Sequence, residues 1–209
     1  MIETDVLVVG SGPAGSSSAL FLSTYGVQNM VITKYRWTAN TPRAHITNQR
    51  AVEIMRDMGL EDEIKRKGTP QPLMGDTVFC TSLAGEELAR LHTWGTHPQR
   101  LADYTLASPC IHYDLPQDIF EPIILGAAAA RGSRVRFDTE YLAHEQDADG
   151  VTVRVRDRVS EHEYEIRCKY LIGADGGRSK IAQDLGLPME GEMDWAGSMN
   201  IVFHADLSQ

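Results

Sequence analysis

A glycine-rich turn near the N-terminus has the spacing of a phosphate-binding site. Gly10, Gly12 and Gly15 form the pattern G-x-G-x-x-G, directly after the apolar run Val6–Val9. In such a turn the first glycine allows the tight bend, the second lets the backbone approach a pyrophosphate, and the third lets a helix pack closely on the strand. We therefore predict dinucleotide binding, rather than a glycine turn without a ligand, at Gly10, Gly12, Pro13, Ala14 and Gly15.

The elements that must position this turn can be read from the flanking residues. Val6–Val9 is a branched apolar run of the kind that forms a strand buried on both faces of a parallel sheet. Pro13 suits the first turn of a helix, since its missing N–H costs nothing there, and Gly26 ends that helix. The apolar run 30–33 then predicts a second strand. Together these elements indicate a β-α-β unit.

The end of the second predicted strand departs from the usual dinucleotide pattern. That pattern places Asp or Glu there to bind the ribose hydroxyls, whereas this chain has Thr33 followed by Lys34. Thr33 offers a hydroxyl, and Lys34 with Arg36 would suit a 2′-phosphate. The sequence thus disfavours NAD and leaves NADP and FAD open.

A second glycine-rich turn follows a later strand. The run Tyr170–Ile172 is apolar, and Gly173, Ala174, Asp175 and Gly176 come directly after it, ahead of a short predicted helix that ends at Leu185. Open α/β sheets bind ligands at the carboxyl ends of their strands, so Asp175 is predicted to face the same ligand as the first turn. The alternative is an ordinary Asp-Gly turn.

Charge and composition exclude several classes of partner. The 209 residues carry a net charge of −9, which opposes binding to nucleic acids or anionic lipids. Between Val6 and Val52 there is no acidic residue but four basic ones: Lys34, Arg36, Arg43 and Arg50. This charge suits a small anion, and the alternative is a solvated basic face. No apolar run approaches the roughly 20 residues of a membrane helix, and we expect a cytoplasmic protein with no nucleic-acid or membrane partner.

The cysteine and histidine spacings predict neither a disulfide framework nor a metal site. Three cysteines form no C-x-x-C pair, and we expect reduced, packed thiols at Cys80, Cys110 and Cys168. Six histidines lack metal-ligand spacing and are expected to be ordinary polar residues: His92, His97, His112, His144, His162 and His204.

The remaining elements follow from apolar periodicity and turn residues. We predict helices over 49–58 and 116–131, a hairpin of strands 77–83 and 88–91, and a long surface loop over 92–112. Further strands are predicted over 135–137, 140–146, 151–156, 163–167 and 199–207. The fold class is therefore α/β.

Several motifs together resemble the FAD-dependent aromatic hydroxylases, and within that family the phenol hydroxylases. The resemblance is carried by the N-terminal glycine turn, the stretch Thr41–Arg50 and the run Gly173–Gly176. It extends over Thr81–Leu91, Asp114–Gln117 and Val135–Val151, and so covers almost the whole chain.

This resemblance implies a fold and a domain organisation. The expected fold is a Rossmann-like FAD-binding domain of the p-hydroxybenzoate hydroxylase type, with a β-meander and the start of a substrate-domain sheet. Residues 1–186 would be the FAD-binding domain, with a hairpin insertion at about 75–92, and 187–209 a truncated start of the substrate-binding domain.

The resemblance also implies an activity and a set of site residues. The activity would be hydroxylation of a phenol ortho to its hydroxyl by a flavoprotein monooxygenase, with NAD(P)H and O2 and via a flavin C4a-hydroperoxide. Besides the first turn, the implied FAD contacts are Thr33 and Lys34 at the ribose position, Arg43, Gln117, Tyr141 beside the adenine, Asp175 and Gly176. Neither the choice between NADH and NADPH nor a homo-oligomeric state of the full-length protein follows from it.

His45 is the predicted catalytic residue. By resemblance it lies where related phenol hydroxylases carry an Asp or His close to the phenol oxygen. A phenolate is a better nucleophile than a phenol, and an imidazole accepts protons near neutral pH. The alternative is a polar histidine bonded to backbone in a loop next to the flavin.

The resemblance further implies a third flavin motif, Gly-Asp before a helix, downstream of Asp175. The chain has a single Gly-Asp pair, Gly75–Asp76, which lies upstream and precedes a predicted strand. We therefore expect the N-terminal part of a longer enzyme, inactive by itself. Two rival hypotheses stay open here: an NADP-binding dehydrogenase domain, and a catalytically silent nucleotide-binding fragment.

Overall fold

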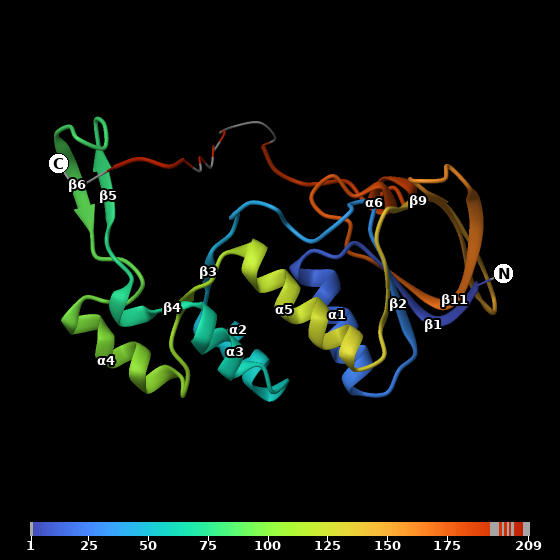
Figure 1. Ribbon diagram of the computed structural model, residues 1–209, viewed down its shortest axis with the longest axis horizontal. Helices are drawn as coiled ribbons and strands as arrows, with labels where there is room; N and C mark the ends of the chain where they lie inside the picture. Colours follow the sequence, from blue (N-terminus) through green and yellow to red (C-terminus); the bar gives the residue numbers. More distant parts are fainter. Residues whose placement is uncertain (1, 193–196, 198, 200, 202, 207–209) are drawn as a thin grey trace. The chain divides into compact units, whose positions relative to one another are not determined.

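The computed structural model describes residues 2–192, 197, 199, 201 and 203–206. It divides the chain into two compact units (Figure 1). The first unit comprises residues 1–43 and 121–209, and the second comprises residues 44–120. Each unit is described by itself below.

A six-stranded sheet organises the first unit, in the order β8-β2-β1-β11-β10-β9. Its strands are β1 (Ile2–Val9), β2 (Asn29–Ile32), β8 (Arg134–Arg136), β9 (Thr139–Asp147), β10 (Gly150–Asp157) and β11 (Glu163–Gly173). The pairs β8-β2, β2-β1 and β1-β11 are parallel, while β11-β10 and β10-β9 are antiparallel. The expected combination of a β-α-β unit with a β-meander is confirmed.

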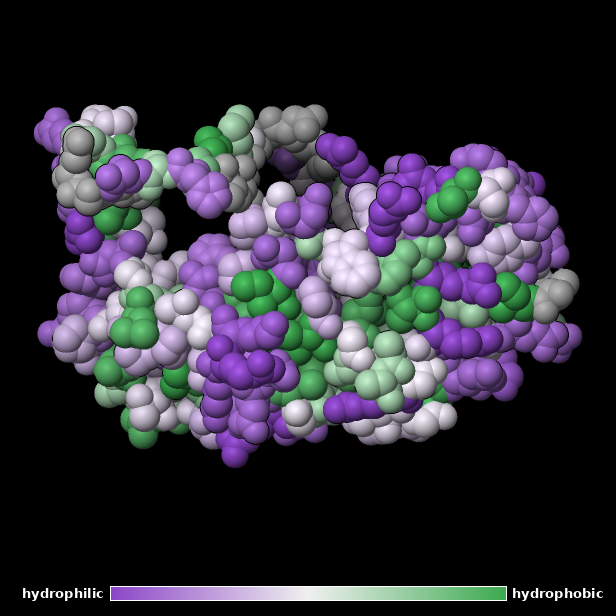
Figure 2. All heavy atoms as spheres, viewed as in Figure 1, coloured by the Kyte–Doolittle hydropathy of each residue, from purple (hydrophilic) through white to green (hydrophobic). Residues whose placement is uncertain are grey.

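The strands of this sheet are buried to different degrees, as their sequences predict. Val6–Val9 of β1 and all of β2 are buried, which is the behaviour of parallel strands covered on both faces. In β10, Val151, Val153 and Val155 are buried and Arg154 is exposed, so only one face of the meander enters the core. Figure 2 shows that hydrophilic residues predominate on the visible outer surface of the meander.

Two helices run side by side in the first unit, α1 (Pro13–Thr24) and the part of α5 (Gln117–Ala130) from Glu121 onwards (Figure 1). Arg131, just past the end of α5, donates from its guanidinium to the Thr24 hydroxyl at 2.6 Å. A third, short helix, α6 (Lys180–Asp184), follows the second glycine turn.

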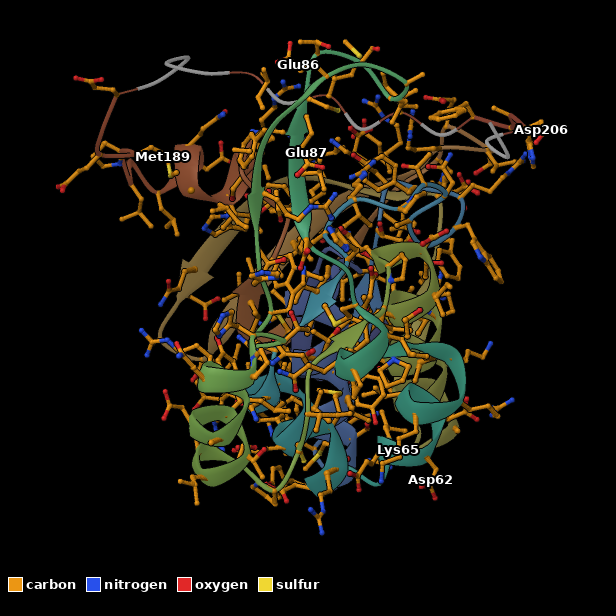
Figure 3. The ribbon with its side chains drawn as sticks, turned by 90° about the vertical axis from the view of Figure 1, so that its left-hand side faces the viewer. Asp62, Lys65, Glu86, Glu87, Met189 and Asp206 are labelled. Carbon is orange, nitrogen blue, oxygen red and sulfur yellow. The ribbon has the colours of Figure 1, made fainter. Side chains whose placement is uncertain are left out.

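The second unit combines small sheets with helices. One sheet joins β3 (Ile46–Thr47), β7 (Tyr113–Asp114) and β4 (Thr69–Pro70), and a separate hairpin pairs β5 (Thr77–Cys80) with β6 (Glu87–Leu91). The α-helices are α2 (Gln49–Asp57), α3 (Glu61–Lys67) and α4 (Pro98–Ala107), with a short 3-10 helix, η1, over Gln71–Leu73. Figure 3 shows Asp62 and Lys65 on α3, and Glu86 and Glu87 at the hairpin, all exposed.

The structure corrects the prediction of a loop over 92–112, because α4 occupies ten of those residues. None of its residues is buried, so the helix contributes no side chain to the core. Its start signals are local: Pro98 occupies the first turn, and the His97 ring accepts a hydrogen bond from the Gln99 N–H at 3.2 Å.

Three further expectations differ from the structure. The strands predicted over 163–167 and 170–172 are one continuous strand, β11, which pairs with β10 over its first half and with β1 over most of its length. Cys80 is exposed rather than packed, on the exposed strand β5. The strand predicted over 199–207 falls partly outside the described residues, and 199, 201 and 203–206 carry no strand.

No helix among the residues that the structure describes combines the length and the apolar character needed to cross a membrane.

Candidate functional site

The first glycine turn is shaped by close backbone packing at Gly10. This residue has a φ of +108°, which favours glycine, and its N–H donates to the Ile32 carbonyl at 2.8 Å. A Cβ added to Gly10 would lie 2.1 Å from the Ala174 carbonyl oxygen, which belongs to the second glycine turn. The two turns, 164 positions apart in sequence, are therefore in direct contact.

Gly15 and Gly12 lie in opposite environments. A Cβ on Gly15 would lie 1.9 Å from the Gly10 carbonyl oxygen, so this glycine allows α1 to start close to the strand. A Cβ on Gly12 would meet nothing nearer than the Glu121 Oε1 atom at 3.9 Å. Space beside Gly12 is therefore kept clear, as the approach of a diphosphate to the backbone requires.

The N-terminus of α1 supplies donors for such a group. Gly12 is its N-cap residue and no side chain caps the helix, while Ser16 uses its hydroxyl on the Ser11 carbonyl at 2.7 Å. The first N–H groups of a helix have no partner within it, and the helix dipole places partial positive charge there. The turn therefore fits the diphosphate of a dinucleotide.

In the second glycine turn, the Asp175 carboxylate forms hydrogen bonds with residues at the start of α6. The Asp175 carboxylate accepts hydrogen bonds from the Ser179 hydroxyl at 2.5 Å and from the Lys180 N–H at 2.8 Å. It also accepts from the Ile181 N–H at 3.3 Å, and Ser179 in turn accepts from the Ala182 N–H. The structure thus places Asp175 as a cap on α6, directly after the Ala174 backbone that touches Gly10.

The strand end at Thr33 is occupied by local bonds. Thr33 is buried, its N–H donates to the Arg136 carbonyl, and its carbonyl accepts from the Thr139 N–H. The hydroxyl accepts from the Tyr35 N–H at 3.5 Å, a long bond. Lys34 is exposed, and its carbonyl accepts from Arg158 at 2.7 Å.

Tyr141 takes part in a polar cluster that joins β9 to α6. Its buried hydroxyl donates to Asp184 Oδ2 at 2.8 Å and lies 2.5 Å from His144 Nδ1. Burial, followed by the nearby Asp184 carboxylate, raises the pKa of Tyr141 well above its usual range. Lys180 and then Tyr141 lower the pKa of Asp184 through hydrogen bonds. The cluster anchors the end of α6 opposite to the end that Asp175 caps.

In the second unit His45 lies beside an acid that sequence reasoning did not single out. Its Nδ1 atom is 3.2 Å from Asp114 Oδ2, and both side chains are partly exposed. The backbone fixes this pair, because the Leu115 N–H donates to the His45 carbonyl at 2.6 Å and β3 pairs Ile46 with Asp114. A carboxylate on Nδ1 leaves Nε2 of a neutral imidazole free to accept a proton.

Trp94 stands next to His45 in a backbone conformation unusual for a bulky residue. Its ring lies edge-on to the His45 ring, with centroids 6.3 Å apart, and its φ is +61°. The buried Gln71 holds it by donating from Nε2 to the Trp94 carbonyl at 2.5 Å. The aromatic ring is therefore held beside the predicted base.

Three further residues were predicted to contact FAD: Arg43, Gln117 and Gly176. Arg43 is an exposed residue at the end of the first segment of the first unit. Gln117 begins α5, and its N–H donates to the Ala44 carbonyl at 2.9 Å. Gly176 has a φ of +91° in the second glycine turn, a conformation that favours glycine.

Glu121 is the second residue that sequence reasoning missed. It is only 2% exposed, faces Gly12 and accepts a hydrogen bond from the Ala39 N–H at 2.5 Å. Its signal in the sequence is a single acid within residues 119–130, which otherwise carry no charged or polar side chain.

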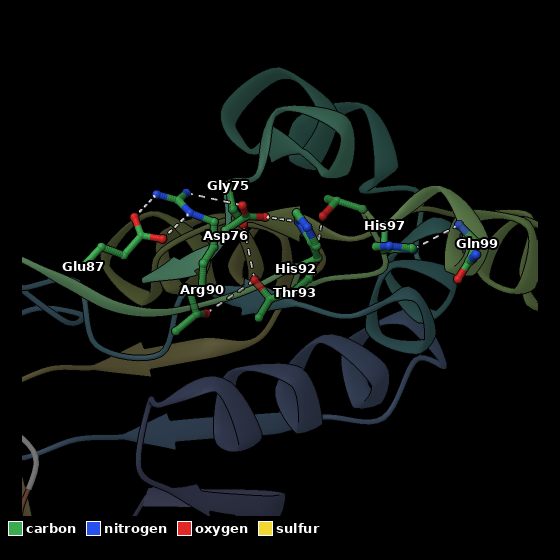
Figure 4. Close-up of polar contacts among 10 residues, drawn as sticks. Gly75, Asp76, Glu87, Arg90, His92, Thr93, His97 and Gln99 are labelled. Carbon is green, nitrogen blue, oxygen red and sulfur yellow. Dashed lines mark hydrogen bonds and ion pairs between the residues drawn. The ribbon is translucent and has the colours of Figure 1, made fainter. Parts of the chain in front are cut away.

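The Gly75–Asp76 pair has a structural role of its own. It directly precedes β5, and the Asp76 carboxylate lies 3.0 Å from His92 Nδ1 and 3.4 Å from the Arg90 guanidinium (Figure 4). The hydrogen bond from His92, followed by that from Arg90, lowers the pKa of Asp76. This pair therefore braces the hairpin, in line with its exclusion as a flavin motif.

Comparison with known proteins gives close relatives. The chain is 60% identical over 208 residues to a phenol 2-monooxygenase of Pseudomonas sp. strain EST1001, covering all of this chain and 33% of that protein. It is 57% identical over 209 residues to a 2,4-dichlorophenol 6-monooxygenase of Delftia acidovorans, of which it covers 36%. The chain thus spans about a third of the length of these relatives.

Solved structures similar to this chain are also monooxygenases. The flavin-dependent monooxygenase PieE, solved in complex with FAD and substrate, matches 91% of this chain with a TM-score of 0.87 and 43% identity, and the match covers 33% of PieE. The p-nitrophenol 4-monooxygenase PnpA of Pseudomonas putida DLL-E4 shares the fold, with a TM-score of 0.76 over 92% of this chain and 46% of that one at 23% identity. The expected p-hydroxybenzoate hydroxylase type of fold is confirmed.

The residues of the first glycine turn, the uncapped start of α1 and the adjoining second turn fit a flavin dinucleotide. A model of the family described as "FAD binding domain" matches residues 3–209, and the chain belongs to that family.

Proposed function

We propose that this chain is the FAD-binding part of a monooxygenase that hydroxylates a phenol ortho to its hydroxyl, using NAD(P)H and O2. The observation that carries the proposal is the clear space beside Gly12 at the uncapped start of α1, where a diphosphate can reach backbone donors. The names of relatives 57–60% identical to the chain support the phenolic substrate. Nothing observed favours the NADP-dehydrogenase alternative, and the β-meander disfavours it.

In this proposal different residues of the chain bind different parts of FAD. The first turn, from Gly10 to Gly15, binds the diphosphate through backbone N–H groups. Asp175 positions the second turn by capping α6, and the Gly176 backbone lies within that turn. Arg43, Gln117, Lys34, Thr33 and Tyr141 are proposed to line the rest of the cofactor site. The bound flavin, once reduced, supplies the activated oxygen.

His45 is proposed to be the base that removes the phenol proton. The contact between Nδ1 and Asp114 supports this role, because it orients the ring and leaves Nε2 to accept the proton. Trp94, edge-on to the His45 ring, offers an aromatic surface beside the base. A phenolate formed there attacks an electrophilic oxygen more readily than the neutral phenol.

The proposal also covers the location of the protein and its cosubstrate. The protein is proposed to act in the cytoplasm on a small phenol, with NADH or NADPH as the cosubstrate. The net charge of −9 supports a small-molecule enzyme rather than a nucleic-acid or membrane partner. A homo-oligomer of the complete enzyme is compatible with these features.

The first test is FAD binding by this chain, followed by the visible absorption of the flavin and by quenching of its fluorescence. The proposal expects saturable binding of one FAD, and a chain that binds no FAD under conditions where it is folded contradicts it.

The second test uses the longer protein that carries this chain. His45→Ala should leave FAD affinity unchanged and slow phenol hydroxylation about 100-fold or more. It should also increase the release of peroxide that is not coupled to product. His162→Ala, an exposed histidine of the first unit, is the matched control. Near-normal hydroxylation by His45→Ala would return His45 to a structural role.

A further inference from the structure

The buried Glu121 carboxylate is unexpected at a site that binds a diphosphate. Burying a charged carboxylate is costly unless hydrogen bonds compensate it. Yet Glu121 is 2% exposed, and its Oε1 atom lies 3.9 Å from the position of a Cβ on Gly12. A buried acid at this position, compensated by hydrogen bonding, indicates a role in shaping the site.

The structure shows which backbone Glu121 holds. Its Oε2 atom accepts the Ala39 N–H at 2.5 Å. Residues 34–43 leave the end of β2 without helix or strand, so their placement depends on side-chain and backbone bonds of this kind. Earlier in the segment, the Tyr35 carbonyl accepts from the Asp138 N–H at 3.0 Å, and Trp37 stacks on Phe137. Glu121 is the anchor that ties the segment's middle to the side of Gly12.

Thr38, directly before the anchored residue, carries an unsatisfied hydroxyl. The residue is 7% exposed, and its Oγ1 atom has no hydrogen-bond partner among the described residues. A buried hydroxyl without a partner costs about 1–3 kcal/mol. Thr33, at the position where the dinucleotide pattern expects the ribose acid, is buried, and its hydroxyl accepts a long hydrogen bond from the Tyr35 N–H. The strand end thus lacks a ribose-binding acid, while a neighbouring hydroxyl lacks a partner.

We infer that Thr38 and Glu121 form a support for the adenosine-diphosphate half of FAD that takes over from the missing acid at the end of β2. Thr38 is the binding residue, whose hydroxyl bonds an oxygen of the ribose or the diphosphate. Glu121 is a positioning residue that holds Thr38 and Ala39 beside the glycine turn. This inference rests on the proposed FAD binding and names residues to which that proposal gives no role.

The test measures FAD affinity and the stability of the FAD-free chain separately. Thr38→Val removes the unsatisfied hydroxyl at constant shape, so it should leave the unfolding temperature of the FAD-free chain unchanged or raised. It should nevertheless weaken FAD binding about 5-fold or more, because a hydrogen bond to the ligand is lost. A merely structural threonine would move both quantities in the same direction. Thr152→Val, on the meander, is the control for FAD affinity, which should stay unchanged although the variant loses the hydrogen bond that Arg167 donates to the Thr152 hydroxyl.

Variants of Glu121 test the positioning role. Glu121→Ala should weaken FAD binding at least about 10-fold, measured at a temperature where the FAD-free variant is folded. Glu121→Gln keeps an oxygen acceptor for the Ala39 N–H and should stay within about 3-fold of the wild type. In the double variant Thr38→Val with Glu121→Ala, the two losses should be less than additive, since one residue acts through the other.

Three results would overturn the inference. They are FAD affinity of Thr38→Val within twofold of the wild type, equal losses in Glu121→Ala and Glu121→Gln, and fully additive losses in the double variant. Each is a ratio to the wild-type chain, so these outcomes are distinct from failure of the proposed function, in which the wild type itself binds no FAD.

Discussion

The two glycine turns of the first unit lie in contact, yet the helix after the first turn has no side-chain cap and the helix after the second turn is capped. The first turn leaves the start of α1 without a side-chain cap and keeps the space beside Gly12 clear. The second turn fills the start of α6 with the Asp175 carboxylate and the Ser179 hydroxyl. An uncapped helix start has donors for a ligand, whereas a capped one has used them. We infer that the first turn binds and the second positions.

The largest expected effect separates glycines that the fold needs from the glycine that the ligand needs. Gly15→Ala places a Cβ 1.9 Å from a backbone oxygen that cannot rotate away, so it should destabilise the chain by more than about 4 kcal/mol and abolish folding. Circular dichroism and denaturant unfolding check this. Gly126→Ala, in α5 with no atom within 4 Å of the added Cβ, should be neutral or stabilising. A Gly15→Ala chain of normal stability would show that the close approach is not required.

Gly12→Val should separate binding from folding. The site has room for a side chain in the absence of ligand, and the φ of Gly12 is −65°, so the free energy of unfolding should change by no more than about 1 kcal/mol. The added side chain would occupy the approach of the diphosphate, and FAD affinity should fall about 100-fold or more, measured by fluorescence titration. Wild-type affinity in this variant would mean that the first turn is not the diphosphate site.

Asp175→Ala tests whether the second glycine turn positions the backbone rather than binding the ligand. Loss of a helix cap should lower the free energy of unfolding by about 1–2 kcal/mol, with a smaller loss of FAD affinity than Gly12→Val causes. Ser179→Ala, which removes the other capping oxygen, should resemble it in both measurements. The opposite pattern, normal stability with a loss of affinity as large as that of Gly12→Val, would mean that Asp175 contacts the ligand directly, as its sequence context predicts.

The smallest effect is expected on the meander, away from both turns. The Arg167 guanidinium, followed by the Asp149 N–H, lowers the pKa of Asp147 to about 2 from its ordinary 3.8. Because the folded-state pKa is the lower one, this pair stabilises the fold above pH 3.8, and its contribution is lost as the pH falls through 2. In Arg167→Ala the pKa of Asp147 should rise towards 3.8, as an NMR titration would show, with FAD affinity unchanged. An unmoved pKa would assign the shift to the turn's backbone instead.

Periodicity predicted the elements with a strong apolar pattern and failed where burial is absent. α2, α5 and the strands β1, β2 and β10 were within reach of the sequence because each buries apolar residues in a regular stripe or run. α1 was predicted from Pro13 at its start and Gly26 at its end. α4 has no buried residue and was predicted as a loop, because its signals are confined to Pro98 and the His97 cap at its start. The union of two predicted strands into β11 depends on pairing with two other strands, β10 directly before it and β1 at the distant N-terminus.

The candidate site also contains features that the sequence predicts and features that depend on tertiary structure. The sequence by itself determined the first glycine turn, since Gly10, Gly12 and Gly15 carry their chemistry in local spacing and backbone freedom. Tertiary structure alone decided that Asp175 caps α6, that Asp114 lies 3.2 Å from His45, and that Glu121 is buried beside Gly12. The physical reason is the sequence separation of the residues that interact. A turn's conformational requirement is met within a few residues, whereas the partner of a carboxylate depends on which distant segments the core brings together.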